Sequence, residues 1–287
     1  MRIRAELHTF WILLRRAGID SYRDNCFGIA KGAAYSALLS FFPVFTTLTA
    51  ILVQAHAHAV SRSLSRVMFQ VVPPGTEEIV MQIFTQRGHR PGYLLFGATL
   101  LSIWAASGLM LSLMEGFRAA YGIPKGRPFL HGRAVAALLV VVVGFPFVLA
   151  SAAIVIGGRA EEWVLQGIGV LPRGQDLKGW VSLLAYVIRL LFSFGSIILG
   201  TSLLYCIGPN PPRQIHRVFP GALLAGCFWW ITTQGFGWYV RNIANYNVLY
   251  GSVGAVMALL VWMYLLSVIA LFGCEFNAAR DRLRARK

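Results

Sequence analysis

Six long apolar stretches divide the chain, and almost every Lys and Arg lies outside them. Each stretch has about 20 residues or more, which is enough for an α-helix to cross a hydrocarbon layer roughly 30 Å thick. The pattern therefore predicts an all-α fold, a polytopic membrane bundle of six transmembrane helices. The expected spans are residues 33–53, 92–114, 134–156, 180–205, 218–240 and 253–274, which together form one transmembrane domain, residues 33–274.

The segment before the first span, residues 1–32, carries apolar residues at helical spacing, while its arginines lie mostly elsewhere on the helical wheel. This pattern is typical of an interfacial amphipathic helix that lies along the inner leaflet, with its arginines near anionic headgroups. A plain membrane anchor would explain the same pattern. The apolar positions are Ile3, Leu7, Phe10, Trp11 and Leu14.

The connection between the first two spans is long and has a periodic pattern of its own. We expect this outer loop, residues 54–91, to fold as short helices interrupted at Pro73-Pro74-Gly75. A lid packed on the outer ends of the bundle is the simpler role for it, and a part in handling a substrate is the alternative.

Composition supports the membrane assignment, because 57% of the 287 residues are hydrophobic and only 13% are charged. The net charge of +15 is distributed by topology. Of the 26 Lys and Arg residues, 17 flank the spans on the side of the two termini and eight on the other side. The positive-inside rule then places both termini in the cytoplasm, with residues 275–287 as a basic tail. No accessible basic face remains that would predict a nucleic-acid partner.

The four cysteines, Cys26, Cys206, Cys227 and Cys274, form no CxxC pair and no spacing typical of metal ligands. We interpret them as small packing residues, because free Cys behaves as a buried hydrophobe. The sequence predicts no cofactor and no metal site.

Arg189 is the one basic residue inside a span. It lies nine residues into the fourth span, roughly 13 Å from the outer boundary if that span begins at residue 180. A charge at that depth costs about 2.5–3.5 kcal/mol on insertion scales and should face the bundle interior or a hydrated cavity. No acidic residue shares its depth, so its partners are helix carbonyls, hydroxyls, water or an anionic ligand. Both a substrate role and a structural, snorkelling role are consistent with this position.

The first span opens with small and hydroxylated residues on one side and carries Pro43 in its interior. Close packing against another helix explains the small residues. A broken helix that lines a cavity is the alternative, since Pro43 frees a backbone carbonyl. The candidate pathway residues in this span are Tyr35, Ser36, Ser40 and Pro43.

The last third of the chain contains a YGSxGA element, then WxY, then G-x-E-x-N. Together with the AAYSALLSFFP run and the segment Trp104–Ser107, it resembles the YihY/BrkB family of bacterial inner-membrane proteins. The resemblance covers nearly the whole chain and implies six spans with both ends inside. Its motif residues are Tyr250, Gly251, Ser252, Gly254, Trp262, Tyr264, Gly273, Glu275 and Asn277.

Members of this family have carried the label ribonuclease BN, which is widely regarded as a misassignment, and others are linked to envelope or lipid phenotypes. A metal-dependent nuclease of the metallo-β-lactamase type needs a cluster such as HxHxDH. The chain offers only His56 and His58, on the outer side. No other catalytic template is present. Glu115 and Glu275 are expected to pair with Arg118 and Arg280 at helical spacing, and proton coupling is the alternative role for these two carboxylates. The sequence therefore argues against an enzyme.

The leading hypothesis is a transporter or flippase-like protein for an anionic, lipidic envelope substrate, in which Arg189 attracts the charge. The alternative is a structural or interaction protein that supports envelope assembly without transport. Membrane lipids are the expected partners, and a homo-oligomer is compatible with the sequence. Close helix contacts are expected at Gly221/Ala225, Gly251/Gly254/Ala255 and Gly195/Gly200.

Overall fold

The computed structural model describes residues 2–54, 92–167, 180–242 and 252–285, and within these ranges the chain forms only helices and their connections. The all-α class is thereby confirmed for the described part of the chain. The expected outer helices between residues 55 and 91 lie outside the described residues. The helices are α1 (Arg2–Arg23), α2 (Cys26–Gln54), α5 (Gly92–Ala120), α6 (Phe129–Gly167), α7 (Trp180–Ile207), α8 (Ile215–Asn242) and α10 (Ser252–Arg284).

Five of these helices contain a segment long and apolar enough to cross a membrane. The sixth expected span corresponds to α8, which is 28 residues long but does not meet that criterion. Helix α8 differs from the five candidate spans in being more polar, since Thr232, Thr233 and Gln234 lie near its middle. The candidate spans are Cys26–Phe45 in α2, Phe96–Ala120 in α5, Phe129–Leu149 in α6, Tyr186–Ile207 in α7 and Val256–Arg284 in α10.

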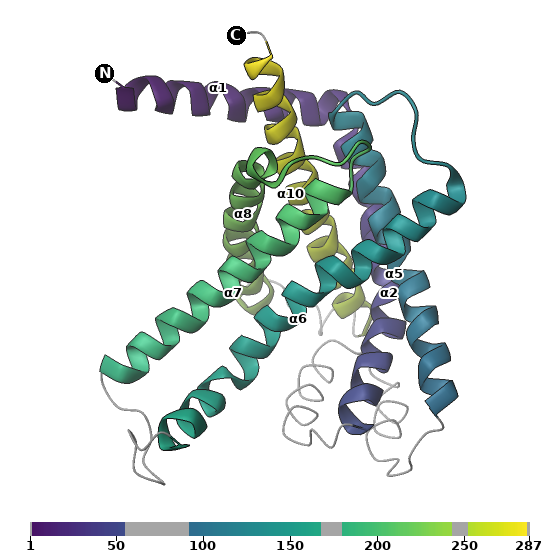
Figure 1. Cartoon of the computed structure of the whole chain (residues 1–287), viewed down its shortest axis with the longest axis vertical. Helices are drawn as coiled ribbons and strands as arrows, with labels where there is room; N and C mark the ends of the chain where they lie inside the picture. The colour runs from purple at the N-terminus through teal and green to yellow at the C-terminus, as the bar shows by residue number, and fades with distance from the viewer. Residues whose placement is uncertain (1, 55–91, 168–179, 243–251, 286–287) are drawn as a thin grey trace.

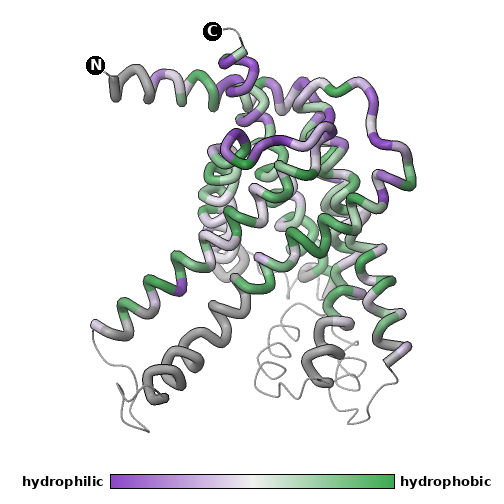
Figure 2. Tube along the Cα trace, in the orientation of Figure 1, coloured by the Kyte–Doolittle hydropathy of each residue, from purple (hydrophilic) through white to green (hydrophobic). Residues whose placement is uncertain are grey.

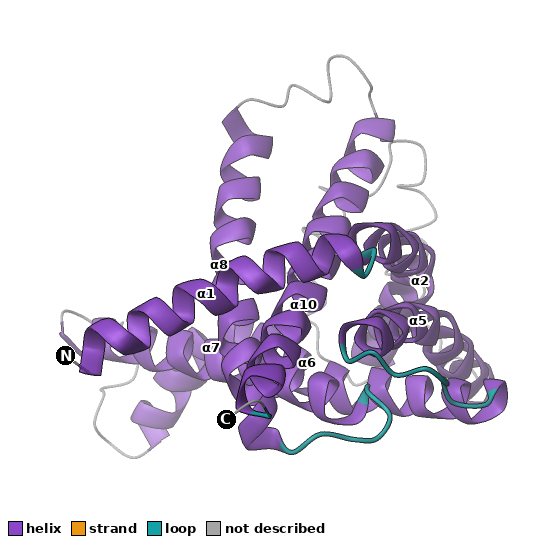
Figure 3. Cartoon of the chain, turned by 90° about the horizontal axis from the view of Figure 1, so that it is seen from above, coloured by secondary structure: helices purple, strands orange, loops and turns teal. Residues whose placement is uncertain are grey.

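Helix α1 and the end of α10 lie at the same end of the molecule (Figure 1). We call this the terminal end; it also includes the connection 121–128 and the turn 208–214. Hydrophilic residues gather there along the chain, while the helices leading away from it are mainly hydrophobic (Figure 2). Seen from above, α1 lies across this end of the bundle (Figure 3). The arrangement separates an aqueous end from an apolar body.

The buried core lies in the half of the bundle next to the terminal end. Each helix except α1 contributes to this core with residues from the half of its length that is nearest to the terminal end. Examples are Ala30 and Ala33 of α2, Phe117 of α5, Leu139 of α6, Tyr205 of α7, Val218 and Ala222 of α8, and Leu271 and Cys274 of α10.

In the other half, large apolar side chains are exposed. They include Phe96 and Leu100 of α5, Leu184 and Leu191 of α7, and Trp230 and Trp238 of α8. The pair α6 and α7 also diverges there from the pair α2 and α5 (Figure 1). The described bundle is therefore packed most closely next to the terminal end, and the apolar surface farther away is exposed, as expected for helices in contact with lipid.

Two helix boundaries differ from the sequence-based spans. Helix α2 begins at Cys26 rather than near residue 33, directly after Asn25, whose positive φ of 54° ends the preceding turn. Helix α10 continues through Arg284, so residues 275–284 are helical rather than a free tail. The reason is packing, because Phe276 and Ala279 form a small buried cluster with Leu13 and Ala17 of α1.

Candidate functional site

Arg189 lies on the part of α7 that is farther from the terminal end, and its side chain is half-buried. Its guanidinium carbon lies 5.7 Å from the ring centre of Tyr186, one turn earlier in the same helix. No ion pair joins it to a described carboxylate. The apolar side chains around it, Ile188, Leu190 and Leu191, are exposed. Arg189 is thus a cation on an apolar stretch of helix whose neighbouring side chains are exposed.

The candidate residues of the first span, which lie on α2, have different surroundings, and Ser36 is the one of them that lies against Gly108 of α5. A Cβ atom added to Gly108 of α5 would lie 3.6 Å from the Ser36 hydroxyl, which shows how closely the two helices approach there. Ser40 is buried and donates to the carbonyl of Ala37 at 2.9 Å. Tyr35, by contrast, is 60% exposed.

Pro43 belongs to a small polar contact between the same two helices. Ser102 of α5 donates to the Pro43 carbonyl at 2.8 Å, and its hydroxyl lies 2.7 Å from that of Thr47. These contacts link α2 and α5 through hydroxyl groups, which is how polar side chains commonly join helices in membranes.

Arg189 and the residues of the first span are not brought together by the described structure. Helix α7 packs mainly on α6 and α8, whereas α2 packs mainly on α5 and α10. Arg189 and the candidate residues Tyr35, Ser36 and Ser40 therefore lie on helices that are not each other's main packing partners. Arg189 must be considered as a separate position.

The G-x-E-x-N motif builds the contact between α10 and α8. Gly273 and Asn277 are four residues apart and so share one face of α10. Asn277 is fully buried; it donates to the Val218 carbonyl at 2.9 Å and accepts from the Gly221 N–H at 2.8 Å. These two groups flank Pro220, which interrupts the hydrogen bonding of α8. The side chain of Asn277 thus supplies partners for a helix backbone beside a proline.

Glycine allows this contact to be close. A Cβ atom on Gly221 would collide with the Gly273 carbonyl oxygen, and one on Gly273 would come within 2.5 Å of the Tyr205 hydroxyl oxygen. Tyr205 of α7 is completely buried and donates to the Ala270 carbonyl at 2.6 Å. The expected contact at Gly221/Ala225 is confirmed, since Ala225 also lies against Gly273.

The expected contact at Gly195/Gly200 is only half present. A Cβ atom on Gly200 would lie 3.1 Å from the Phe147 ring, whereas one on Gly195 would meet nothing within 4 Å. Helix α6 therefore approaches α7 at Gly200, which lies nearer the terminal end, and not at Gly195.

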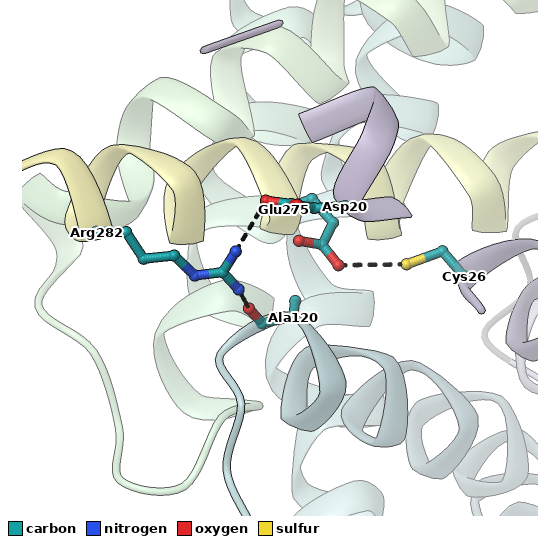
Figure 4. A network of polar contacts seen from close by, with 5 residues as sticks. All are labelled: Asp20, Cys26, Ala120, Glu275 and Arg282. Atoms are coloured by element: carbon teal, nitrogen blue, oxygen red, sulfur yellow. Dashed lines mark hydrogen bonds and ion pairs between the residues drawn. The ribbon is translucent and has the colours of Figure 1, made fainter. Parts of the chain in front are cut away.

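Glu275 points away from α8, because a residue two positions from Gly273 and Asn277 lies on the opposite side of the helix. It is fully buried and accepts a weak hydrogen bond from the Cys26 thiol at 3.5 Å. Close by, Arg282 donates to Asp20 of α1 at 2.8 Å and to the Ala120 carbonyl at the end of α5 (Figure 4). One surface of α10 therefore joins α1, α2 and α5.

The pairing of Glu275 with Arg280, expected from helical spacing, is wrong for the described residues, because no ion pair joins them. The burial of Glu275 against α2 explains the difference, since its carboxylate is turned to the Cys26 thiol. The pairing of Glu115 with Arg118 is confirmed at 3.7 Å, and both side chains are substantially exposed.

The remaining motif residues contribute to packing or lie outside the described part. Tyr250 and Gly251 fall outside it, Ser252 begins α10, and Gly254 is buried. Tyr264 is half-buried against the main core, and Trp262 is half-buried.

Sequence reasoning missed the cations that organise the connections at the terminal end. Arg127 donates to the carbonyls of Ile207, Gly208 and Pro209 at 3.0, 2.6 and 2.8 Å and so caps the end of α7. The Arg213 guanidinium lies 4.3 Å from the ring centre of Tyr121. Burial raises the pKa of the Tyr121 phenol well above its usual value, so the ring stays neutral beneath the cation.

A signal for these contacts exists in the sequence, because both arginines stand in short, proline-containing connections next to helix ends, where carbonyls lack partners. The positive-inside count uses them only as markers of topology. For metals, no group of three or more potential ligands occurs among the described residues, and His56 and His58 lie outside them.

Several proteins resemble this chain over most of its length. A Bacillus subtilis protein named putative ribonuclease-like protein YfkH is 29% identical over 257 residues, which cover 88% of this chain and 89% of that protein. Proteins named UPF0761 membrane protein from Chromobacterium violaceum and Alkalilimnicola ehrlichii are 25% and 26% identical. Their matches cover 88% and 90% of this chain but only 57% and 55% of their own lengths.

No solved structure matches the chain. The family model described as virulence factor BrkB matches residues 20–287, nearly the whole sequence. The apolar helices and the relatives named as membrane proteins agree with this match. The chain therefore is a membrane protein and belongs to the BrkB virulence factor family.

Proposed function

We propose that this protein moves an anionic lipid or another anionic envelope component across the bacterial inner membrane, and that Arg189 attracts the anionic group. The observation that carries the proposal is the position of Arg189 on α7. It is a half-buried cation amid exposed apolar side chains, and no described carboxylate pairs with it. A charge on such a surface is costly unless an anion or water accompanies it.

The depth of Arg189 depends on where α7 enters the hydrocarbon layer. The candidate span within α7 begins at Tyr186, only three residues before Arg189. The helix itself begins at Trp180, which is 86% exposed, and exposed Leu183 and Leu184 follow it. Because Trp side chains favour the membrane–water interface, we place the boundary at Trp180 and Arg189 about 13 Å below it.

This proposal includes a topology of six crossings. Helix α8 starts at the terminal end and leads away from it, and α10 returns to it (Figure 1). Two ends on one side of a membrane require an even number of crossings, so α8 would cross together with the five candidate spans. The excess of Lys and Arg would make the terminal end cytoplasmic, with α1 along the inner leaflet.

An anionic amphiphile fits these surroundings better than a small soluble anion. The acyl chains would contact the exposed apolar side chains of α7, such as Leu184 and Leu191, and the headgroup would contact the guanidinium. Arg binds phosphate with two parallel hydrogen bonds, which makes phosphate-bearing lipids the most suitable class.

A structural role without transport is the second candidate. The observation that favours it is that Ser36 and Pro43 contact α5, while the Ser40 hydroxyl is bonded within α2. In that case Arg189 would snorkel toward the outer interface, and its replacement would leave lipid distribution unchanged.

The two candidates are distinguished in proteoliposomes that contain a fluorescent phosphatidylglycerol in both leaflets. A membrane-impermeant reductant bleaches the outer leaflet, and the slower loss of the remaining signal reports transfer between leaflets. We expect the wild-type protein to transfer phosphatidylglycerol faster than phosphatidylcholine. Arg189→Leu should lower the phosphatidylglycerol rate at least tenfold, because a charge-assisted hydrogen bond contributes about 1.5–3 kcal/mol.

Arg189→Lys should retain part of the rate, since Lys keeps the charge but not the paired hydrogen bonds. Arg217→Leu is the matched control, because Arg217 is an exposed arginine of α8 near the terminal end. Equal transfer by wild type and Arg189→Leu, or no transfer by folded wild-type protein, would overturn the proposal.

A further inference from the structure

A cavity of about 300 Å³ lies at the terminal end, apart from Arg189. Its walls come from the last turns of α5, the connection 121–128, the start of α6 and the turn after α7. This volume is at the lower limit of typical ligand sites and would accommodate a headgroup rather than a whole lipid.

Basic side chains outnumber acidic ones in this cavity, since Arg118, Lys125 and Arg127 line it together with the single carboxylate of Glu115. Lys125 lines it and makes no ion pair or hydrogen bond with any described residue. Arg118 also lines it and has only the loose contact with Glu115 at 3.7 Å, in which both side chains are substantially exposed. Exposed ion pairs of this kind contribute little, so Arg118 can turn to a stronger anion at small cost.

The frame around these two cations is well fixed. Arg127 also lines the cavity, but its guanidinium is committed to three carbonyls at the end of α7. It thereby attaches the connection to the turn after α7 and neutralises the negative end of that helix. Gly122, with a φ of 62°, ends α5 and donates to the Ala119 carbonyl at 2.9 Å. Lys125 is therefore held beside Arg118 by a connection anchored at both sides.

The cavity is amphipathic. Leu111, Met114 and Ile123 supply apolar wall, while Ser112 and Asn210 supply groups that can donate hydrogen bonds. This combination suits an anion attached to a short carbon chain, such as a glycerol phosphate group. A divalent cation would be repelled by the two basic side chains.

We propose that this cavity binds a phosphate ester, with Arg118 and Lys125 as its charged ligands. The ester is either the headgroup of an anionic phospholipid of the inner leaflet or a soluble phosphate such as glycerol 3-phosphate. The site is independent of the proposed transport function, because binding at the terminal end requires neither Arg189 nor movement of lipid.

Native mass spectrometry of the full chain in an uncharged detergent tests this site. The protein is titrated with phosphatidylglycerol, with phosphatidylcholine, and with glycerol 3-phosphate. We expect one phosphatidylglycerol to bind more tightly than phosphatidylcholine. The double variant Arg118→Gln/Lys125→Gln should weaken this binding about tenfold or more, since both contacts to the phosphate are charge-assisted. Competition by millimolar glycerol 3-phosphate would assign the site to soluble esters, and its absence would assign the site to the lipid.

The control is Arg217→Gln/Arg284→Gln, which removes the same charge from exposed positions outside the cavity. Its binding should match the wild type. A further variant, Glu115→Gln, keeps every cation and removes the competing carboxylate, so it should tighten binding about threefold.

Glu115→Gln also keeps the test decisive should the double variant be unstable. Three results would overturn the proposal: no preference of the wild type for phosphatidylglycerol, an equal loss in the control pair, or unchanged binding in Glu115→Gln.

Discussion

Replacing Asn277 by Ala should destabilise the bundle more than any other single loss of a polar side chain in α10. The side chain is 1% exposed and serves the N–H of Gly221 and the carbonyl of Val218 at once. Its removal leaves two backbone groups beside Pro220 without this partner in a buried contact. At about 1–3 kcal/mol for each unsatisfied buried group, the expected loss is about 2–6 kcal/mol in the free energy of unfolding.

The competing expectation is a smaller loss in the free energy of unfolding, because hydrogen bonds between membrane helices average only about 0.6 kcal/mol in double-mutant cycles. The larger value should hold here because Gly221 and Gly273 bring the helix backbones too close for a replacement partner to enter. Reversible unfolding in mixed micelles with increasing sodium dodecyl sulfate, followed by circular dichroism, measures the difference. Gln234→Ala is the control, since Gln234 is an exposed carboxamide on α8. A loss below about 0.5 kcal/mol, or one equal to that of the control, would refute the reasoning.

Three further predictions concern the same end of the bundle and use the same unfolding measurement. Gly273→Ala should lower the free energy of unfolding by about 1–3 kcal/mol, because its Cβ atom would crowd the Tyr205 hydroxyl. Gly18→Ala is the control and should be neutral or stabilising, because nothing lies within 4 Å of a Cβ atom there. Equal effects of the two substitutions would contradict this account. Tyr205→Phe should cost about 1 kcal/mol by removing the hydrogen bond to Ala270, and an unchanged midpoint would argue against that bond. Arg127→Met should lower the free energy of unfolding by about 2–3 kcal/mol, because the end of α7 loses its charged cap. The same loss should speed proteolysis of the connection 121–128. Unchanged proteolysis would show that the cap does not hold the connection.

The helices themselves were predictable from the sequence, because the length of an apolar stretch directly reflects the thickness of the layer it must cross. Family membership was predictable as well, from motifs spread over the last third of the chain. The continuation of α10 beyond Cys274 was not predictable, since the charged residues after Cys274 marked the end of the apolar stretch. Only the packing of Phe276 and Ala279 on α1 shows that the helix continues in a buried environment.

The internal contacts of the motif could not be read from spacing alone. Gly273 and Asn277 were identified as motif residues, but their role depends on Pro220, which is more than 50 positions away in sequence. The same holds for Glu275, whose partner Cys26 lies 249 residues away. Local spacing instead suggested Arg280. A helical period fixes which residues share a face, but not which helix that face will meet.

Arg189 is the opposite case. The sequence singles it out as the one basic residue inside an expected span, whereas only the structure shows what surrounds it. The apolar stretch made its charge exceptional. In the fold Arg189 lies among exposed apolar side chains of α7, a helix that packs mainly on α6 and α8 rather than on the α2 helix of Tyr35, Ser36 and Ser40.

The most direct test of the transport proposal is an experimental structure of the protein in nanodiscs that contain phosphatidylglycerol. We predict density for a lipid phosphate within hydrogen-bonding distance of the Arg189 guanidinium, with acyl chains along α7. A guanidinium bonded only to protein groups, or extended to the outer interface with no headgroup beside it, would contradict the proposal.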